Sequence, residues 1–107
     1  MNRIHILKGF LEQDASDSFS RYALALEYVK NGQVEDARRE FEYVRDHDPA
    51  YGATYFQLAQ LYRNLGLRHE GEKTYRTGIT VAAKAGDAHT QSELEEALEG
   101  LLSEDEN

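Results

Sequence analysis

The sequence predicts an all-α fold of about six helices, and three observations support this prediction. A pattern of apolar, aromatic and glycine residues recurs at an interval of 34 residues. A fixed period between about 20 and 50 residues is typical of stacked repeats. Apolar residues elsewhere recur at helical spacing, and a chain of 107 residues with a single proline suits helices. The closest matches pair Leu24 with Leu58, Ala25 with Ala59, Tyr28 with Tyr62 and Gly32 with Gly66. Looser matches at the same interval pair Ala37 with Gly71, Phe41 with Tyr75 and Val44 with Gly78.

The first half of the chain contains three predicted helices. Residues 2–13 place apolar side chains at helical spacing on a broad face. Asp17 or Ser18 can cap the next helix by accepting a bond from a free backbone N–H. We expect that helix to end at Gly32, because glycine readily adopts the left-handed conformation found at helix ends. A third helix, over 34–47, stops at the chain's proline, since the residue before proline disfavours helical torsions.

The second half repeats this plan and then departs from it. Helices are predicted over 51–65 and 68–85, with Gly66 between them. Two glycines inside 68–85 each cost roughly 1 kcal/mol relative to alanine, which makes sense where two helices approach closely. Asp87 is a good N-cap for a last, amphipathic helix, after which 104–107 read as an acidic tail. The apolar face of this last helix comprises Leu94, Ala97, Leu98, Leu101 and Leu102.

Composition restricts the classes of function. The absence of cysteine excludes disulfides, thiol nucleophiles and Cys-ligated zinc. A formal net charge of −8 would repel phosphate backbones, so we expect no nucleic-acid partner. Arg3, His5 and Lys8 interrupt the apolar run that a signal peptide needs, and no stretch approaches the ~20 apolar residues of a membrane span. We therefore expect a soluble, cytoplasmic protein that does not bind membranes.

The repeated residues carry a resemblance to a known family. The first copy reads Leu24-Ala25-x2-Tyr28, then Ala37-x3-Phe41, then a proline. This spacing resembles the tetratricopeptide repeat, whose unit is about 34 residues long with the pattern W-x2-L-G-x2-Y, A-x3-F, P. Two departures are that Arg and Tyr stand at the usual Trp position and that the second copy lacks the proline. The two departing residues at the Trp position are Arg21 and Tyr55.

The resemblance implies a right-handed α-α superhelix of antiparallel helix pairs in a single domain. We expect repeats at 18–51 and 52–85, preceded by an N-terminal helix within 1–16 and followed by a capping helix at 87–103. The N-terminal helix matches the second half of a repeat, because Leu7 lies 34 residues before Phe41.

The resemblance also implies a binding site, since first helices of this family line a concave groove for extended or helical peptides. On the first helix of repeat 1, the packing stripe is complete without a second apolar stripe that includes Phe19, Tyr22 and Leu26. We expect this second stripe to line the groove. The predicted groove residues are Phe19, Tyr22, Leu26, Lys30, Phe56, Gln57, Gln60, Arg63 and Asn64.

Other readings of the same stripe stay open. The N-terminal helix could cover it. A second copy of the chain could cover it instead, which would make the protein a homodimerisation unit. An enzyme is not expected, because no catalytic serine motif and no phosphate-binding glycine loop occurs. No pair of histidines has the i, i+4 spacing of a helical zinc site, so we expect no metal and no cofactor. The sequence therefore predicts a protein-interaction module whose partner is a protein or peptide.

Overall fold

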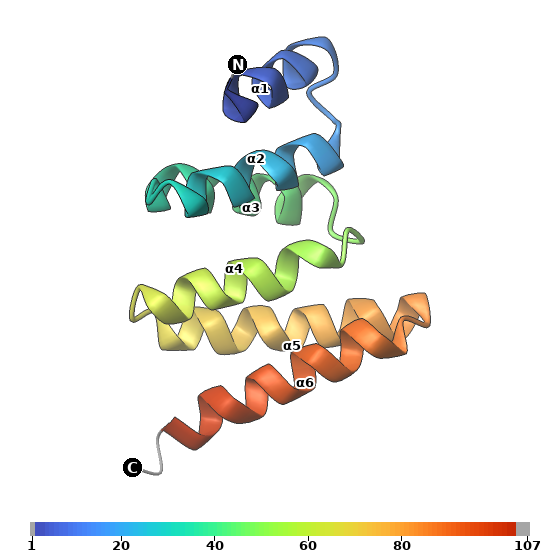
Figure 1. Ribbon diagram of the computed structural model, residues 1–107. Helices are drawn as coiled ribbons and strands as arrows, with labels where there is room; N and C mark the ends of the chain where they lie inside the picture. Colours follow the sequence, from blue (N-terminus) through green and yellow to red (C-terminus); the bar gives the residue numbers. More distant parts are fainter. Residues whose placement is uncertain (1, 105–107) are drawn as a thin grey trace. The chain divides into compact units, whose positions relative to one another are not determined.

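The computed structural model describes residues 2–104, and six α-helices account for the regular structure there (Figure 1). Residues 105–107, which belong to the predicted acidic tail, lie outside the described residues. The all-α prediction is confirmed. By their contacts the residues divide into two compact units, one ending at Tyr51 and one beginning at Gly52. The helices are α1 (Arg3–Gln13), α2 (Ser18–Lys30), α3 (Val34–His47), α4 (Ala53–Asn64), α5 (Arg68–Ala85) and α6 (Ala88–Ser103).

The first unit consists of α1, α2 and α3, with α2 packed against both of the others. Asp17, as predicted, caps α2: its Oδ1 accepts from the backbone N–H of Ser20 at 3.1 Å. The Ser20 hydroxyl donates to Asp17 Oδ2 at 2.6 Å and holds the pKa of that carboxyl below its ordinary value. The backbone reverses at Gly32, where φ is 76°. The buried apolar residues are Leu7, Ala23, Leu24, Ala25, Tyr28, Ala37, Phe41 and Val44.

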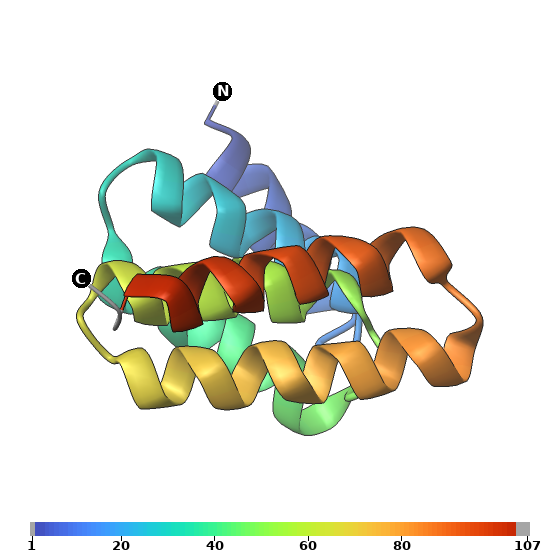
Figure 2. The ribbon, with the colours of Figure 1, turned by 90° about the horizontal axis from the view of Figure 1, so that it is seen from below.

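The second unit consists of α4, α5 and α6, and Figure 2 shows α5 and α6 running alongside each other in opposite directions. Its core includes Tyr55 from α4, Tyr75 from α5 and Leu94 from α6, each no more than 1% exposed. Gly78 lies where α5 meets both neighbours, since a Cβ built there would stand 2.6 Å from the Cβ of Tyr55. The predicted close approach of helices is therefore present at this glycine.

Two predicted boundaries differ from the structure. Helix α4 begins at Ala53 rather than at Tyr51, because the backbone N–H of Tyr51 donates to the Asp48 carbonyl (3.0 Å) in the turn around the proline. Glu104, expected in a frayed tail, is the C-cap of α6 and forms an ion pair with Arg63. Between residues 2 and 104 we find no helix with the length and apolarity that a bilayer crossing requires.

Candidate protein-binding surfaces

The predicted binding face of the first unit lies on α2. Phe19 is the most exposed large apolar side chain in residues 2–104, with 63% of its surface accessible. Tyr22 and Leu26 follow at helical spacing and are half-buried, whereas Lys30 is exposed in the last turn of the helix. The face thus has a free aromatic ring at one end, a partly covered apolar middle and a positive charge at the other end.

Tyr22 is fixed by aromatic neighbours from its own unit. Its ring centroid lies 5.9 Å from that of Phe41, edge-on, and 5.7 Å from that of Tyr51. Such pairs contribute about 0.5–1.5 kcal/mol beyond the apolar area they bury. Burial, followed by the charges of Asp17 and Asp48, raises the pKa of the Tyr51 phenol. Tyr22 therefore packs against two aromatic rings of its own unit and lies one turn after Phe19 on α2.

The predicted binding face of the second unit lies on α4. Phe56 packs edge-on against Tyr75 with centroids 6.4 Å apart, and it borders the apolar core of the unit. Gln60 Oε1 accepts from the Tyr75 hydroxyl at 3.1 Å, which leaves the amide N–H groups of Gln60 as donors. Gln57 is half-buried and Asn64 is exposed. The face combines an anchored ring with amides that can pair with a peptide backbone.

Arg63 is held by the end of α6. Its Nε donates to Glu104 Oε1 at 3.0 Å and its Nη2 contacts the same oxygen. The Glu104 carboxylate raises the pKa of Arg63, while burial raises the pKa of the neighbouring Tyr75 phenol. Since Glu104 already pairs with this guanidinium, a ligand anion would have to compete for it. Arg63 is thus less available to a ligand than its prediction as a groove residue implied.

The structure brings the predicted residues together within each unit. Phe19, Tyr22, Leu26 and Lys30 share α2, and the remaining five share α4. That the two sets form one groove stays a prediction.

A cavity of about 240 Å³ in the first unit was not predicted from the sequence. Arg21, at the usual Trp position, lines it and lies 3.8 Å over the ring of Tyr43. The Arg21 guanidinium also donates to Glu40 Oε1 at 2.7 Å and to the Ala15 carbonyl at 2.9 Å. Arg21 at the usual Trp position was the feature of the sequence that could have predicted this stacking. A flat guanidinium can replace a ring on an aromatic face. With these partners Arg21 serves packing rather than ligand binding.

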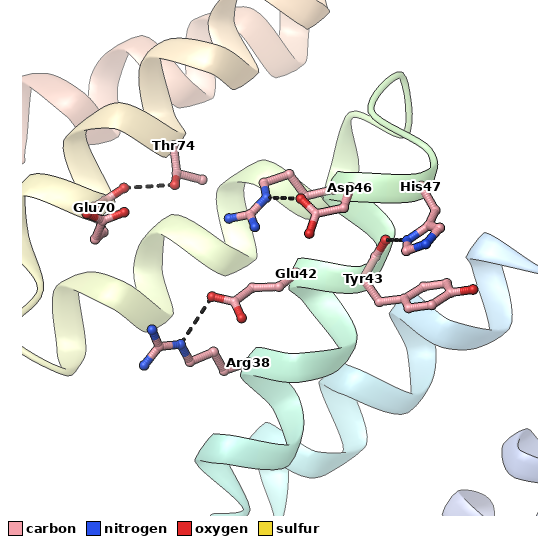
Figure 3. Close-up of polar contacts among 8 residues, drawn as sticks. Arg38, Glu42, Tyr43, Asp46, His47, Glu70 and Thr74 are labelled. Carbon is pink, nitrogen blue, oxygen red and sulfur yellow. Dashed lines mark hydrogen bonds and ion pairs between the residues drawn. The ribbon is translucent and has the colours of Figure 1, made fainter.

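Tyr43 also stacks on His47, with ring centroids 3.8 Å apart. His47 Nδ1 lies 2.9 Å from the Tyr43 carbonyl oxygen (Figure 3), and on the same helix Arg38 pairs with Glu42 at 3.1 Å. In the second unit the Thr74 hydroxyl donates to the Glu70 carbonyl one turn earlier (Figure 3). Among residues 2–104, no group of three acidic, histidine or cysteine side chains is arranged to hold a metal ion. Each of these polar contacts lies within a single helix.

Comparison with known proteins identifies the family. Residues 52–84 match the model of the tetratricopeptide repeat. The solution NMR structure of a tetratricopeptide repeat domain protein from Salinibacter ruber is 38% identical to the chain. That match covers 82% of this chain and 89% of the other, with a TM-score of 0.79. The chain belongs to the tetratricopeptide repeat family.

Further matches agree with this assignment. A crystal structure of a tetratricopeptide repeat domain protein from S. ruber is 37% identical over 81% of this chain and 97% of the other, with a TM-score of 0.79. The type III secretion translocator chaperone SycD of Yersinia enterocolitica has a TM-score of 0.87 at 18% identity, over 97% and 72% of the chains, and shows the fold alone. No curated protein matches the chain. A tetratricopeptide repeat fold implies a protein-interaction or scaffold role.

Proposed function

We propose that this tetratricopeptide repeat chain is a non-enzymatic, cytoplasmic interaction module that binds an apolar peptide or helix on the first helices of its two repeats. In this proposal the repeats are 18–51 and 52–85, the N-terminal helix lies in 1–16 and the capping helix is 87–103. The observation that carries the proposal is Phe19, a ring 63% exposed beside the fixed ring of Tyr22. Large contiguous apolar patches on soluble proteins mark interaction surfaces, and in this proposal Phe19, Tyr22 and Leu26 together form such a patch.

The polar residues of the two faces suit the same ligand. Gln57 and the amide N–H groups of Gln60, whose oxygen accepts from Tyr75, can pair with a peptide backbone next to an apolar anchor. Lys30 and Asn64, both exposed, would contact the ends or polar side chains of the ligand. Because Arg63 is engaged by Glu104, we assign apolar contacts rather than capture of a carboxylate as the main source of affinity.

Selection of peptides from a random display library, followed by measured affinities, tests the proposal. We expect selected peptides to contain apolar anchors and to lose at least tenfold in affinity for Phe19→Ser and for Phe56→Ala, since buried aromatic anchors contribute about 2 kcal/mol or more. Phe19→Ser is the cleaner variant, because the Phe19 ring is largely exposed in the free protein. Phe10→Ser is the matched control: this ring is 51% exposed but lies on α1.

Two results would overturn the proposal. One is a set of selected peptides whose affinities are the same for wild type and both variants. The other is a sedimentation experiment in which the chain self-associates and Phe19→Ser abolishes that association, because the stripe would then be a homodimer surface.

A further inference from the structure

Helices α1 and α6 lie outside the two proposed repeats. Helices α2–α3 and α4–α5 form pairs, whereas α1 precedes the first pair and α6 follows the second. The 34-residue interval aligns Leu7 of α1 with Phe41 of α3, which gives α1 the register of a second helix. In chain order, α6 occupies the place of a first helix. By register, α1 therefore corresponds to a second helix of a repeat and α6 to a first helix.

Helix α1 leaves an apolar strip uncovered. Leu7 is its buried residue and α1 packs on α2. Ile6 and Phe10, one turn apart, are 39% and 51% exposed. Arg3 lies one turn before Ile6; its side chain is 61% exposed and forms a long ion pair of 3.8 Å with Glu27. The strip is thus an apolar ridge with a positive charge at its N-terminal end.

The second unit has an open groove of about 650 Å³ between α5 and α6. Ile79, Leu98 and Leu102 provide its apolar surface, and Leu102 is 37% exposed. Its border carries Glu95 and Glu99, and within residues 2–104 no ion pair reaches either carboxylate. The border cation, Arg76, is already paired with Glu72 at 3.1 Å. The groove therefore combines a narrow apolar strip, of which Leu102 is the exposed part, with a negatively charged border.

Helices α1 and α6 lack the charged residues that would stabilise their own ends. Helix N-termini favour anions and C-termini favour cations. Helix α1 begins with Arg3 and has no acid in its first turn, and α6 has no basic residue in its last turn. An antiparallel contact between the two would place Arg3 beside Glu99 and the negative end of the α6 dipole. It would also place the opposed helix dipoles side by side.

We propose that α1 of one copy docks in the α5–α6 groove of the next copy, antiparallel to α6, so that two copies complete one helix pair between them. Ile6 and Phe10 contact Ile79, Leu98 and Leu102. This contact is heterologous, and a contact of this kind joins copies into a closed ring or an open chain. One helix face is smaller than the ~800 Å² per partner of stable complexes, so the association is weak and depends on concentration.

Analytical ultracentrifugation of the full chain, with one variant at each end, tests the proposal. Wild-type mass should rise with concentration above that of a monomer. Phe10→Glu blocks the α1 end and Leu102→Glu blocks the groove, so each variant alone should associate at least tenfold more weakly. A mixture of the two should form a one-to-one dimer and nothing larger, because each variant supplies the end that the other lacks. Circular dichroism melts confirm that both variants fold.

Two further experiments complete the test: a charge reversal across the proposed contact and a variant on a different surface. Glu99→Arg should weaken association, and Arg3→Glu in the same chain should restore it. Phe19→Ser, on the proposed peptide-binding face, should associate like wild type, so the two proposals can fail independently. Wild type that stays monomeric at every concentration, either end variant associating as wild type does, or loss of association in Phe19→Ser would overturn head-to-tail docking.

Discussion

At the scale of single residues, two glycines in the same helix have different surroundings. A Cβ at Gly78 would meet Tyr55 Cβ at 2.6 Å and Leu94 Cδ1 at 3.0 Å. A Cβ at Gly71 would meet the Ala59 carbonyl oxygen at 3.4 Å and Leu101 at 3.8 Å, which are ordinary contacts. The sequence predicted close approach at both positions without distinguishing them, because the clash depends on which atoms of α4 and α6 lie opposite.

We expect Gly78→Ala to destabilise the protein by about 1–3 kcal/mol, since the added methyl displaces Tyr55 and Leu94 in a filled core. Gly71→Ala is the matched control and should be neutral or stabilising by up to ~1 kcal/mol, because alanine has the higher helix propensity. Urea unfolding of the two variants and wild type measures the difference. Equal effects of both substitutions would show that helix propensity, and not the space around Gly78, decides stability.

At the scale of helices, the sequence predicted most boundaries because local residues determine them. Gly32 and Gly66 adopt the expected positive φ of 76° and 79°, and Asp17 and Asp87 cap the helices predicted for them. The hydrogen bonds that candidate site residues make with distant parts of the chain could not be predicted in this way. Arg63 meets Glu104 across 41 positions and Gln60 meets Tyr75 across 15, and no local pattern encodes such pairs.

Helix α6 should be essential to the second unit, because its buried leucines complete the core shared with α4 and α5. Leu94 is fully buried, so Leu94→Ala should cost about 2–5 kcal/mol. Leu102→Ala, on the same helix but 37% exposed, should cost less than ~1 kcal/mol at concentrations where the chain is monomeric. Chemical unfolding measures both. A chain cut after Gly86 that still melts cooperatively at the wild-type temperature would contradict this role.

At the scale of the whole chain, charge is the property that the repeats do not determine. Acidic residues number 20 against 12 Lys and Arg, which gives a formal charge of −8. Many of the charged residues form exposed pairs within one helix, such as Arg76 with Glu72 at 3.1 Å, and such pairs contribute little. Because excess like charge repels in the folded state, the net charge should oppose compaction while favouring solubility.

Salt should therefore raise the melting temperature. Ions screen exposed charges over about 10 Å at 0.1 M, so most of the rise should come below ~0.5 M NaCl and level off above it. A double variant, Glu12→Gln with Glu96→Gln, changes two exposed positions and takes the formal charge from −8 to −6. Its melting temperature should be higher than that of wild type at low salt and should rise less as salt is added. Differential scanning calorimetry of wild type and this variant across the salt series makes the comparison at a concentration below association. A flat or falling curve for the wild type would mean that exposed ion pairs, which salt weakens, matter more than repulsion among the excess acids.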